Sequence, residues 1–303
     1  TLREPGEYGI QDPPVTFGYF STDQGARKIS TENTQAALER FSYRKLSKNN
    51  RLTYDVLNYY LELSKKENEY LLYEEPLGIV SGVQTQIPVL LSEYQFHSKE
   101  DVDAYLELMK TTPEYFKSLI AFEREKAERG LFMAGYTADT VIEQCQAFLD
   151  MGNSNYLIST FVDRIQQLAD LSEQEKSDYI QKNAYMLKTY VLPAYTQLIQ
   201  AVVELKELGK NEAGLCYLPN GKEYYELTVQ ALTGSPRTVP ELQKLTKKQM
   251  KDDLDAMQQA AGMTAKQAKE TAVMDSSDPQ EILNSLGMDI AKTFPKLPET
   301  SVE

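Results

Sequence analysis

The feature that most constrains the fold of this chain is its series of well-marked helix starts. Ser172 is followed three residues later by Glu175, a spacing at which each side chain bonds to the other residue's backbone N–H in a capping box. Such a box satisfies donors that the first helical turn otherwise leaves unpaired. Starts with a cap, a first-turn proline or acidic residues occur at Ser98, Thr112, Thr137, Ser172, Thr264 and Asp278. The sequence therefore predicts a succession of helices.

The apolar residues after these starts recur every three or four positions, which is typical of helices that bury one face. The longest such stretch runs from Glu173 to Leu208, and Pro193 must kink or divide it because proline lacks a backbone donor. The best strand candidate is the short segment 215–218 ahead of an Asn-Gly turn. We therefore predict an all-α fold, an irregular multi-helix bundle with few or no strands.

Local composition divides the chain into three segments. Residues 1–29 are rich in glycine and proline, which predicts an extended, irregular N-terminal arm. Residues 30–208 are expected to form the main helical bundle, and residues 209–303 a C-terminal helical segment that follows a glycine-rich stretch. The end, 294–303, carries two prolines and no helical pattern. We interpret it as a connector to a further part of the protein.

The charge of the chain limits its partners. The formal net charge is -13, and an acidic surface repels phosphate backbones, so nucleic-acid binding is not expected. The one basic cluster, Lys247 to Lys251, is followed at once by Asp252 and Asp253 and is interpreted as a solvated helix face. No run of 18 apolar residues occurs, so no transmembrane segment is predicted in this chain.

The scarcity of histidine limits the chemistry. Most zinc hydrolases and nucleophile triads depend on histidine, and His97, just ahead of a helix cap, is the only one here. Cys145 lies among helical core positions and is predicted to be an inert buried thiol, with a disulfide to Cys216 left open. Paired acids such as Glu74-Glu75 are interpreted as solvated surface. We expect no catalytic residue and no metal ligand in this chain.

Tyrosine is the one enriched residue type, with 20 tyrosines against 10 phenylalanines. A tyrosine hydroxyl at a polar boundary suits a ligand cleft as well as helix packing. The glycine turn before a tyrosine pair lets backbone approach a ligand closely. The candidate substrate-binding residues are therefore Pro219, Asn220, Gly221, Tyr224 and Tyr225. Ordinary packing is the alternative interpretation for both tyrosines.

The order of several short segments resembles a known family. These segments are 76–91, Asp101–Leu106, Thr112–Phe116, Glu128–Leu131, Ala134–Tyr136, Val191–Tyr195, Leu218–Tyr225, Leu232–Thr233 and Phe294–Pro298. Together they resemble the N-terminal half of the bacterial domain-of-unknown-function family 885. Members of that family are often described as lipoproteins or peptidases, and they are similar to the gluzincin zinc peptidases, including helical carboxypeptidases of the Taq type.

The resemblance implies a division of labour between two halves of a longer protein. In the family, a metal motif of the form His-Glu-x-x-Pro-Gly-His lies in the C-terminal half, beyond the proline-marked segment 294–303. The resemblance implies zinc in the full-length parent and a peptide or small-molecule substrate bound with the help of that half. It also implies an extracellular, membrane-anchored lipoprotein. This chain would then supply a wall of the substrate cleft and be inactive alone.

Two alternatives to this hypothesis stay open. The first is a non-catalytic helical module of a surface lipoprotein that binds peptides or other partners without cutting them. The second is a self-sufficient enzyme that uses carboxylates alone, since paired carboxylates held across a cleft can do acid–base chemistry.

Overall fold

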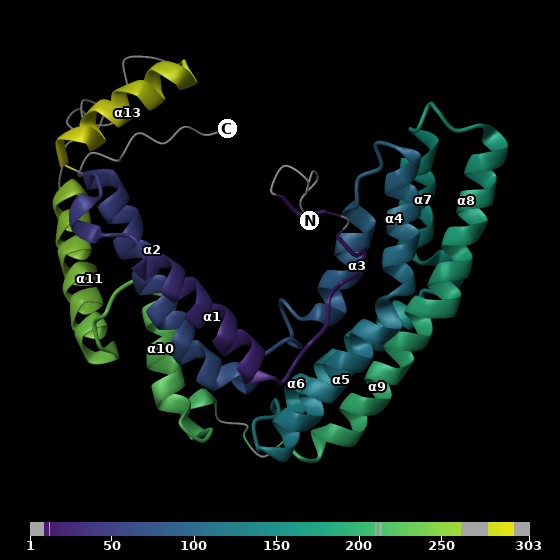
Figure 1. Cartoon of the computed structure of the whole chain (residues 1–303), viewed down its shortest axis with the longest axis horizontal. Helices are drawn as coiled ribbons and strands as arrows, with labels where there is room; N and C mark the ends of the chain where they lie inside the picture. Colours follow the sequence, from purple (N-terminus) through teal and green to yellow (C-terminus); the bar gives the residue numbers. More distant parts are fainter. Residues whose placement is uncertain (1–8, 12, 210, 212–213, 262–277, 294–303) are drawn as a thin grey trace. The chain divides into compact units, whose positions relative to one another are not determined.

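The computed structural model describes residues 9–11, 13–209, 211, 214–261 and 278–293. Helices make up this part of the chain, and it contains no strand, which confirms the all-α prediction (Figure 1). The longer helices are α1 (Gln24–Glu39), α2 (Lys48–Glu67), α3 (Val83–Glu93), α4 (Lys99–Lys110), α5 (Thr112–Glu128), α6 (Gly135–Asp150), α7 (Tyr156–Gln166), α8 (Glu173–Met186), α9 (Leu192–Lys206), α10 (Gly221–Thr233), α11 (Val239–Ala261) and α13 (Pro279–Thr293).

Short helical turns join several of these elements. They are the 3₁₀ turns η2 (Tyr43–Lys45), η3 (Asn68–Tyr73), η4 (Gly152–Ser154) and η6 (Leu215–Tyr217) and the π turn η5 (Leu187–Val191). Within the described residues the chain forms two compact units. Unit 1 contains the residues up to Thr34 together with Glu62–Leu227, and unit 2 contains Gln35–Leu61 and the residues from Thr228 onward. The sequence-based division into 1–29, 30–208 and 209–303 is a different partition and stays a prediction.

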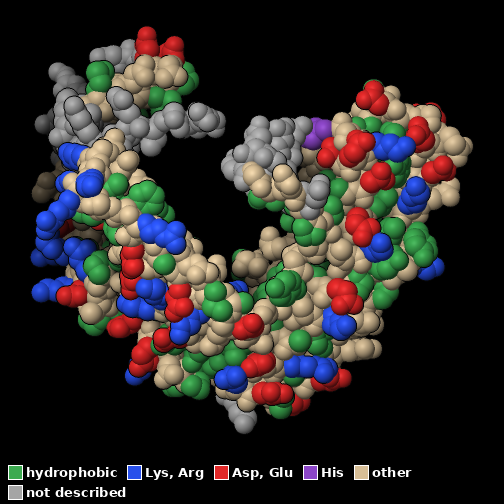
Figure 2. Space-filling model, in the orientation of Figure 1, with side chains coloured by type: hydrophobic (Ala, Val, Ile, Leu, Met, Phe, Trp, Pro, Cys, Tyr) green, Lys and Arg blue, Asp and Glu red, His purple; other side chains and the backbone are tan. Residues whose placement is uncertain are grey.

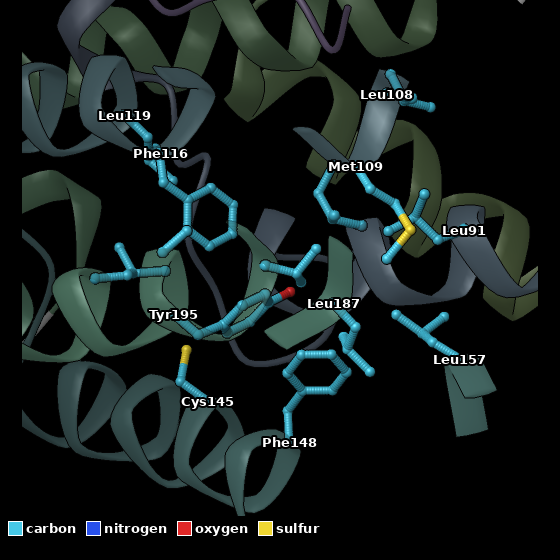
Figure 3. Packing of buried hydrophobic residues seen from close by; sticks show 14 of the residues in the cluster. Leu91, Leu108, Met109, Phe116, Leu119, Cys145, Phe148, Leu157, Leu187 and Tyr195 are labelled. Atoms are coloured by element: carbon cyan, nitrogen blue, oxygen red, sulfur yellow. The ribbon is translucent and has the colours of Figure 1, made fainter. Parts of the chain in front are cut away.

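The core of unit 1 forms around α9. Closely packed helix pairs include α6–α9, α5–α9, α7–α8, α3–α7 and α4–α8. Tyr195 of α9 is fully buried, and its ring centroid lies 4.9 Å from that of Phe116 on α5 and 4.6 Å from that of Phe148 on α6 (Figure 3). The apolar face of α9 continues with Leu198, Val202 and Leu205, all buried. The three-and-four spacing of the sequence thus becomes the contact that holds three helices together.

Pro193 divides the long helical stretch, as predicted. α8 ends at Met186, the π turn η5 follows, and α9 begins at Leu192 with the proline in its first turn. A first-turn proline costs little, because that N–H has no partner within the helix. At the start of α8 the Ser172–Glu175 capping box is present with both of its reciprocal bonds.

Pro88 removes one hydrogen-bond donor from α3, and a side chain of α9 replaces it. Pro88 lies inside this helix and has no N–H, so the carbonyl four residues earlier, on Gln84, loses its helical donor. The Tyr195 hydroxyl donates to that carbonyl at 2.7 Å. Because Gln84 and Tyr195 are both buried, this bond replaces one that water cannot supply.

Some local expectations were wrong. Helix α1 begins at Gln24, so the last residues of the predicted arm are helical. The strand candidate 215–218 contains the 3₁₀ turn η6 instead. Thr112 is the first residue of α5 and donates to the Met109 carbonyl rather than capping. The expected capping box at Thr264–Gln267 and the connector 294–303 lie outside the described residues.

Unit 2 has a much thinner interior. Among its described side chains, Leu61 is the only buried apolar one. Polar contacts supplement it: the Gln35 amide donates to Asn58 Oδ1 at 2.9 Å, and the Tyr43 hydroxyl donates to Asp55 Oδ2 at 2.9 Å.

The bond between α9 and the proline-containing α3 can be measured by a double-mutant cycle. We expect Tyr195→Phe to lower the free energy of unfolding by about 1–3 kcal/mol, because the buried Gln84 carbonyl loses its donor. In a Pro88→Ala background the new N–H supplies that donor, so the same substitution should cost less than about 1 kcal/mol. Urea unfolding followed by circular dichroism measures both costs. Equal costs in the two backgrounds would contradict the assignment.

Candidate functional site

The candidate site is organised by η3, which presents different residues to two sides. Leu71 and Leu72 are buried and form a small cluster with Phe122 of α5 and with Leu131. The residues on either side of this pair, Tyr70 and Tyr73, are instead part of a tyrosine cluster with α10. A short 3₁₀ turn therefore fixes both an apolar contact and an aromatic contact within unit 1.

The tyrosine cluster consists of Tyr70, Tyr73 and Tyr224. The Tyr224 ring centroid lies 5.4 Å from that of Tyr70 and 4.8 Å from that of Tyr73. The Tyr73 hydroxyl donates to the carbonyl of Pro219, which fixes the turn before α10 to η3. Burial, then the neighbouring Tyr70 and Glu223, raise the pKa of Tyr73. This hydroxyl therefore stays protonated at neutral pH and acts as a hydrogen-bond donor, not as a nucleophile.

The backbone of the turn at 218–221 restricts which residues can occupy two of its positions. Asn220 has a φ of 49°, in the left-handed region that asparagine tolerates better than most residues. A Cβ built on Gly221 would lie 1.8 Å from the carbonyl oxygen of Leu215. Glycine is thus required at this position for a close approach of the chain to itself. The sequence predicts that the same glycine lets a ligand approach, and that role stays a prediction.

The structure places the five predicted residues differently. Tyr224 is half-buried in the tyrosine cluster, Gly221 is buried, and the Pro219 carbonyl accepts from Tyr73. Asn220 is exposed, and Tyr225 is 48% exposed. Pro219 is exposed as well, so Pro219, Asn220 and Tyr225 are the members of this set that face solvent, and a role in ligand binding stays a prediction for all five.

Sequence reasoning missed Tyr70 and Tyr73. They are separated from Tyr224 by about 150 positions, and no local pattern links the two segments. The available signal was their three-residue spacing around an apolar pair. That spacing indicates a turn with two differently occupied faces, but it does not identify the partner.

A second group that the sequence did not reveal lies on α5. Lys126 is fully buried, and its Nζ donates to the Glu74 carbonyl at 2.6 Å. The same Nζ lies 3.3 Å from Glu75 Oε2 and 3.9 Å from Glu123 Oε2. Glu74 itself pairs with Arg27 at the surface, at 2.7 Å. Glu75 is exposed, as the interpretation of Glu74-Glu75 as solvated surface predicts, but its carboxylate also pairs with a buried amine.

Glu123 is the unusual member of this group. Its side chain is buried, and neither carboxylate oxygen has a hydrogen-bond partner. Burial raises the pKa of Glu123 to about 7; Lys126 lowers this pKa and Glu75 raises it. Because Lys126 is nearly 4 Å away, it offsets only part of the cost of burying this charge. Near neutral pH the Glu123 carboxyl therefore exchanges between protonated and charged forms.

The histidine and the two cysteines lie outside both of these groups. His97 is exposed, as the purple side chain in Figure 2 shows, and its backbone N–H donates to Asp101 Oδ2 at 2.8 Å. Cys145 and Cys216 are both free, and burial raises the pKa of Cys145 to about 12, which confirms the buried, unreactive thiol. Among the described residues, no group of three histidines, cysteines or acids is placed to hold a metal ion.

The Glu123 carboxyl should make stability depend on pH. Its folded pKa of about 7 lies above the ordinary glutamate value of 4.5, so its contribution to stability is complete below about pH 4.5 and lost as the pH rises through 7. Glu123→Gln should remove this dependence and be more stable than the wild type at pH 8, by up to about 3 kcal/mol. Urea unfolding from pH 5 to 8 measures it. The control is Glu128→Gln, an exposed position of the same helix, which should keep the wild-type slope.

The Tyr73 hydroxyl should hold the turn before α10 in place. Removing it in Tyr73→Phe costs about 1 kcal/mol of local stability. Hydrogen exchange at the Leu218 and Gly221 amides, which donate within this turn, should then speed up about fivefold. Tyr70→Phe keeps the aromatic contact and serves as the matched control. Identical exchange in both variants would show that the Tyr73–Pro219 bond does not hold the turn.

Comparisons with known proteins provide the family. No curated protein matches the chain. It is similar to the crystal structure of a protein from Colwellia psychrerythraea described as a "putative lipoprotein", with 12% sequence identity and a TM-score of 0.72. The match covers 91% of this chain and 51% of the other, so the chain spans about half the length of that protein and shares its fold. No helix in the described residues is long and apolar enough to cross a membrane. The family of bacterial proteins of unknown function DUF885 matches residues 18–300, and the chain belongs to it.

Proposed function

We propose that this chain is the helical, substrate-binding part of a zinc-dependent peptidase whose metal ligands lie in another part of a longer polypeptide. The observation that carries the proposal is the match to only 51% of a similar solved structure, over 91% of this chain. A chain that spans half of a longer fold is expected to share its function with the other half. The resemblance to gluzincin peptidases supplies the reaction class.

The residues that the structure describes do not fit a zinc site by themselves. Structural and catalytic zinc sites take three or four ligands from histidine, cysteine and acids, and the described residues bring no three of these together. Zinc, when bound by the other half, would polarise the scissile carbonyl and activate water. The role of the present chain is then to bind and orient the substrate and to exclude solvent.

Three exposed side chains near the start of α10 are suited to that role. Asn220 and Tyr225 face solvent at the turn, and Tyr217 of η6 is 70% exposed. An aromatic ring with a hydroxyl offers apolar area to a substrate side chain and a hydrogen bond to a peptide group. The Tyr73 hydroxyl of the tyrosine cluster bonds to the Pro219 carbonyl and fixes the turn. The backbone of these residues is therefore ordered before a substrate binds.

The cellular setting is part of the proposal. The similar solved protein is described as a lipoprotein, and members of the family are often described in the same way. We infer an extracellular, membrane-anchored protein whose anchor lies outside the described residues.

A non-catalytic function is the second candidate. The feature that favours it is the combination of exposed tyrosines with the lack of any metal-binding group among the described residues. In that case the same turn would bind peptides without cleaving them, on the surface of an anchored protein.

The test compares this 303-residue chain with the longest polypeptide that its gene encodes. We expect roughly one zinc per longer polypeptide by mass spectrometry, none in the 303-residue chain, and peptidase activity that a chelator abolishes. In the longer polypeptide, Tyr225→Ala should lower kcat/KM about tenfold through KM, while Tyr136→Ala, a tyrosine similarly exposed on α6, should not.

Two results would contradict the proposal. A reading frame that ends with this chain, or a longer polypeptide without zinc, would exclude the metallopeptidase. Peptide binding by the 303-residue chain that a chelator does not affect would then support the non-catalytic candidate.

A further inference from the structure

Helix α11 buries almost nothing, although its sequence is amphipathic. Val239 and Leu242 are partly exposed, and every other described side chain of this helix is exposed. Met250, Leu254 and Met257 are 59%, 55% and 68% exposed. Their spacing of four and three residues places them on one side of the helix. An apolar stripe therefore runs along the C-terminal half of α11 without cover.

Helix α2 carries a second stripe of the same kind within unit 2. Leu52, Val56 and Tyr60 follow one another at intervals of four, which places them on one face, and they are 52%, 58% and 64% exposed. Single exposed apolar residues are common on protein surfaces, but contiguous apolar patches mark sites of interaction.

The interior of unit 2 shows why this matters. Among its described side chains, only Leu61 is both apolar and buried, whereas unit 1 buries apolar residues along most of its helices. Small units that bury little apolar surface are marginally stable at best. The apolar residues of unit 2 are present in its sequence but lie on its surface, so unit 2 resembles one side of an interface.

The length of the similar solved protein indicates which segment covers this surface. The similar Colwellia psychrerythraea chain extends over about twice the matched length, so half of that polypeptide has no counterpart in this chain. A second copy of this chain is a poorer occupant, because each copy has a formal net charge of -13 and two such surfaces repel each other. A segment of the same polypeptide carries no such penalty from association, since a covalent link supplies a high local concentration.

The edge of the stripe adds a charge requirement. Lys247 lies three residues before Met250, and Lys251 lies three residues before Leu254, so both border the apolar stripe. Asp253, three residues after Met250, borders it as well. Figure 2 shows Lys and Arg side chains gathered along α11. The segment that covers α11 should therefore present apolar residues, with acidic residues placed to face the two lysines.

We propose that the apolar stripes of α2 and α11 are the docking surface for the half of a longer family polypeptide that this chain does not include. The inference rests on the proposed function in one respect, namely that a second half exists. It adds which surface of this chain that half covers. The flexible methionines of α11 suit such a contact, because methionine adapts its shape to an apolar partner.

Hydrogen exchange in α11 tests the proposal. We expect the amides of Met250 to Met257 to exchange at least about tenfold more slowly in the longest polypeptide of the gene than in the 303-residue chain. In the longer polypeptide, Met250→Asp with Leu254→Asp should remove that protection. The matched control is Gln259→Asp, which introduces the same residue on the opposite side of α11 and should keep it.

The other outcomes overturn the docking proposal. Equal exchange of α11 in the two polypeptides would show that the second half does not cover this surface. Concentration-dependent dimers of the 303-residue chain in sedimentation velocity, abolished by Met250→Asp with Leu254→Asp, would assign the surface to a second copy instead.

The two proposals fail in different ways. A longer polypeptide that protects α11 but contains no zinc and cleaves no peptide would contradict the proposed function and support the docking surface. A zinc peptidase in which α11 exchanges freely would contradict the docking surface alone.

Discussion

The structure of unit 1 depends on the packing of α9 between α5 and α6 around the buried Tyr195. This contact fixes α5, and α5 in turn presents Phe122 and Lys126 to η3. Once η3 is fixed, its tyrosines can hold the turn before α10. The candidate site is therefore held in place by core packing that α5 transmits to η3. The Tyr195 hydroxyl, which replaces the donor missing at Pro88, secures α3 to the same core.

The buried acid–base group on α5 shows what such a core tolerates. A buried lysine amine needs acceptors, and Lys126 has the backbone carbonyl of Glu74 and the carboxylate of the exposed Glu75. Burial is the main reason that the pKa of Glu123 rises to about 7; Lys126 lowers this pKa, and the second acid, Glu75, adds a smaller rise. Burial of a second carboxyl is costly for stability. Glu123 lies on the helix that packs against η3.

The sequence predicted features that arise from neighbouring residues and missed those that join distant ones. The capping box at Ser172 and the division at Pro193 depend on a few adjacent positions, and both are present. The segment 215–218 was ambiguous because an apolar tetrapeptide suits a strand or a tight turn, and the close contact of Gly221 with Leu215 imposes the turn. The contact of Tyr73 with Pro219 depends on the whole fold. No pattern in a single sequence encodes it.

The contrast between the two units connects structure with function. Both draw on the same composition, 41% apolar over the whole chain, yet unit 1 buries its apolar residues and unit 2 leaves many of them exposed. Exposed apolar helix faces are costly in water unless a partner covers them, so natural selection retains them where a partner exists. Unit 1 has the properties of a stable platform for the exposed tyrosines, and unit 2 has those of a surface that becomes complete on association. Under the two proposals, the chain would work as part of a larger polypeptide, with the substrate-binding residues on unit 1 and the docking surface on unit 2.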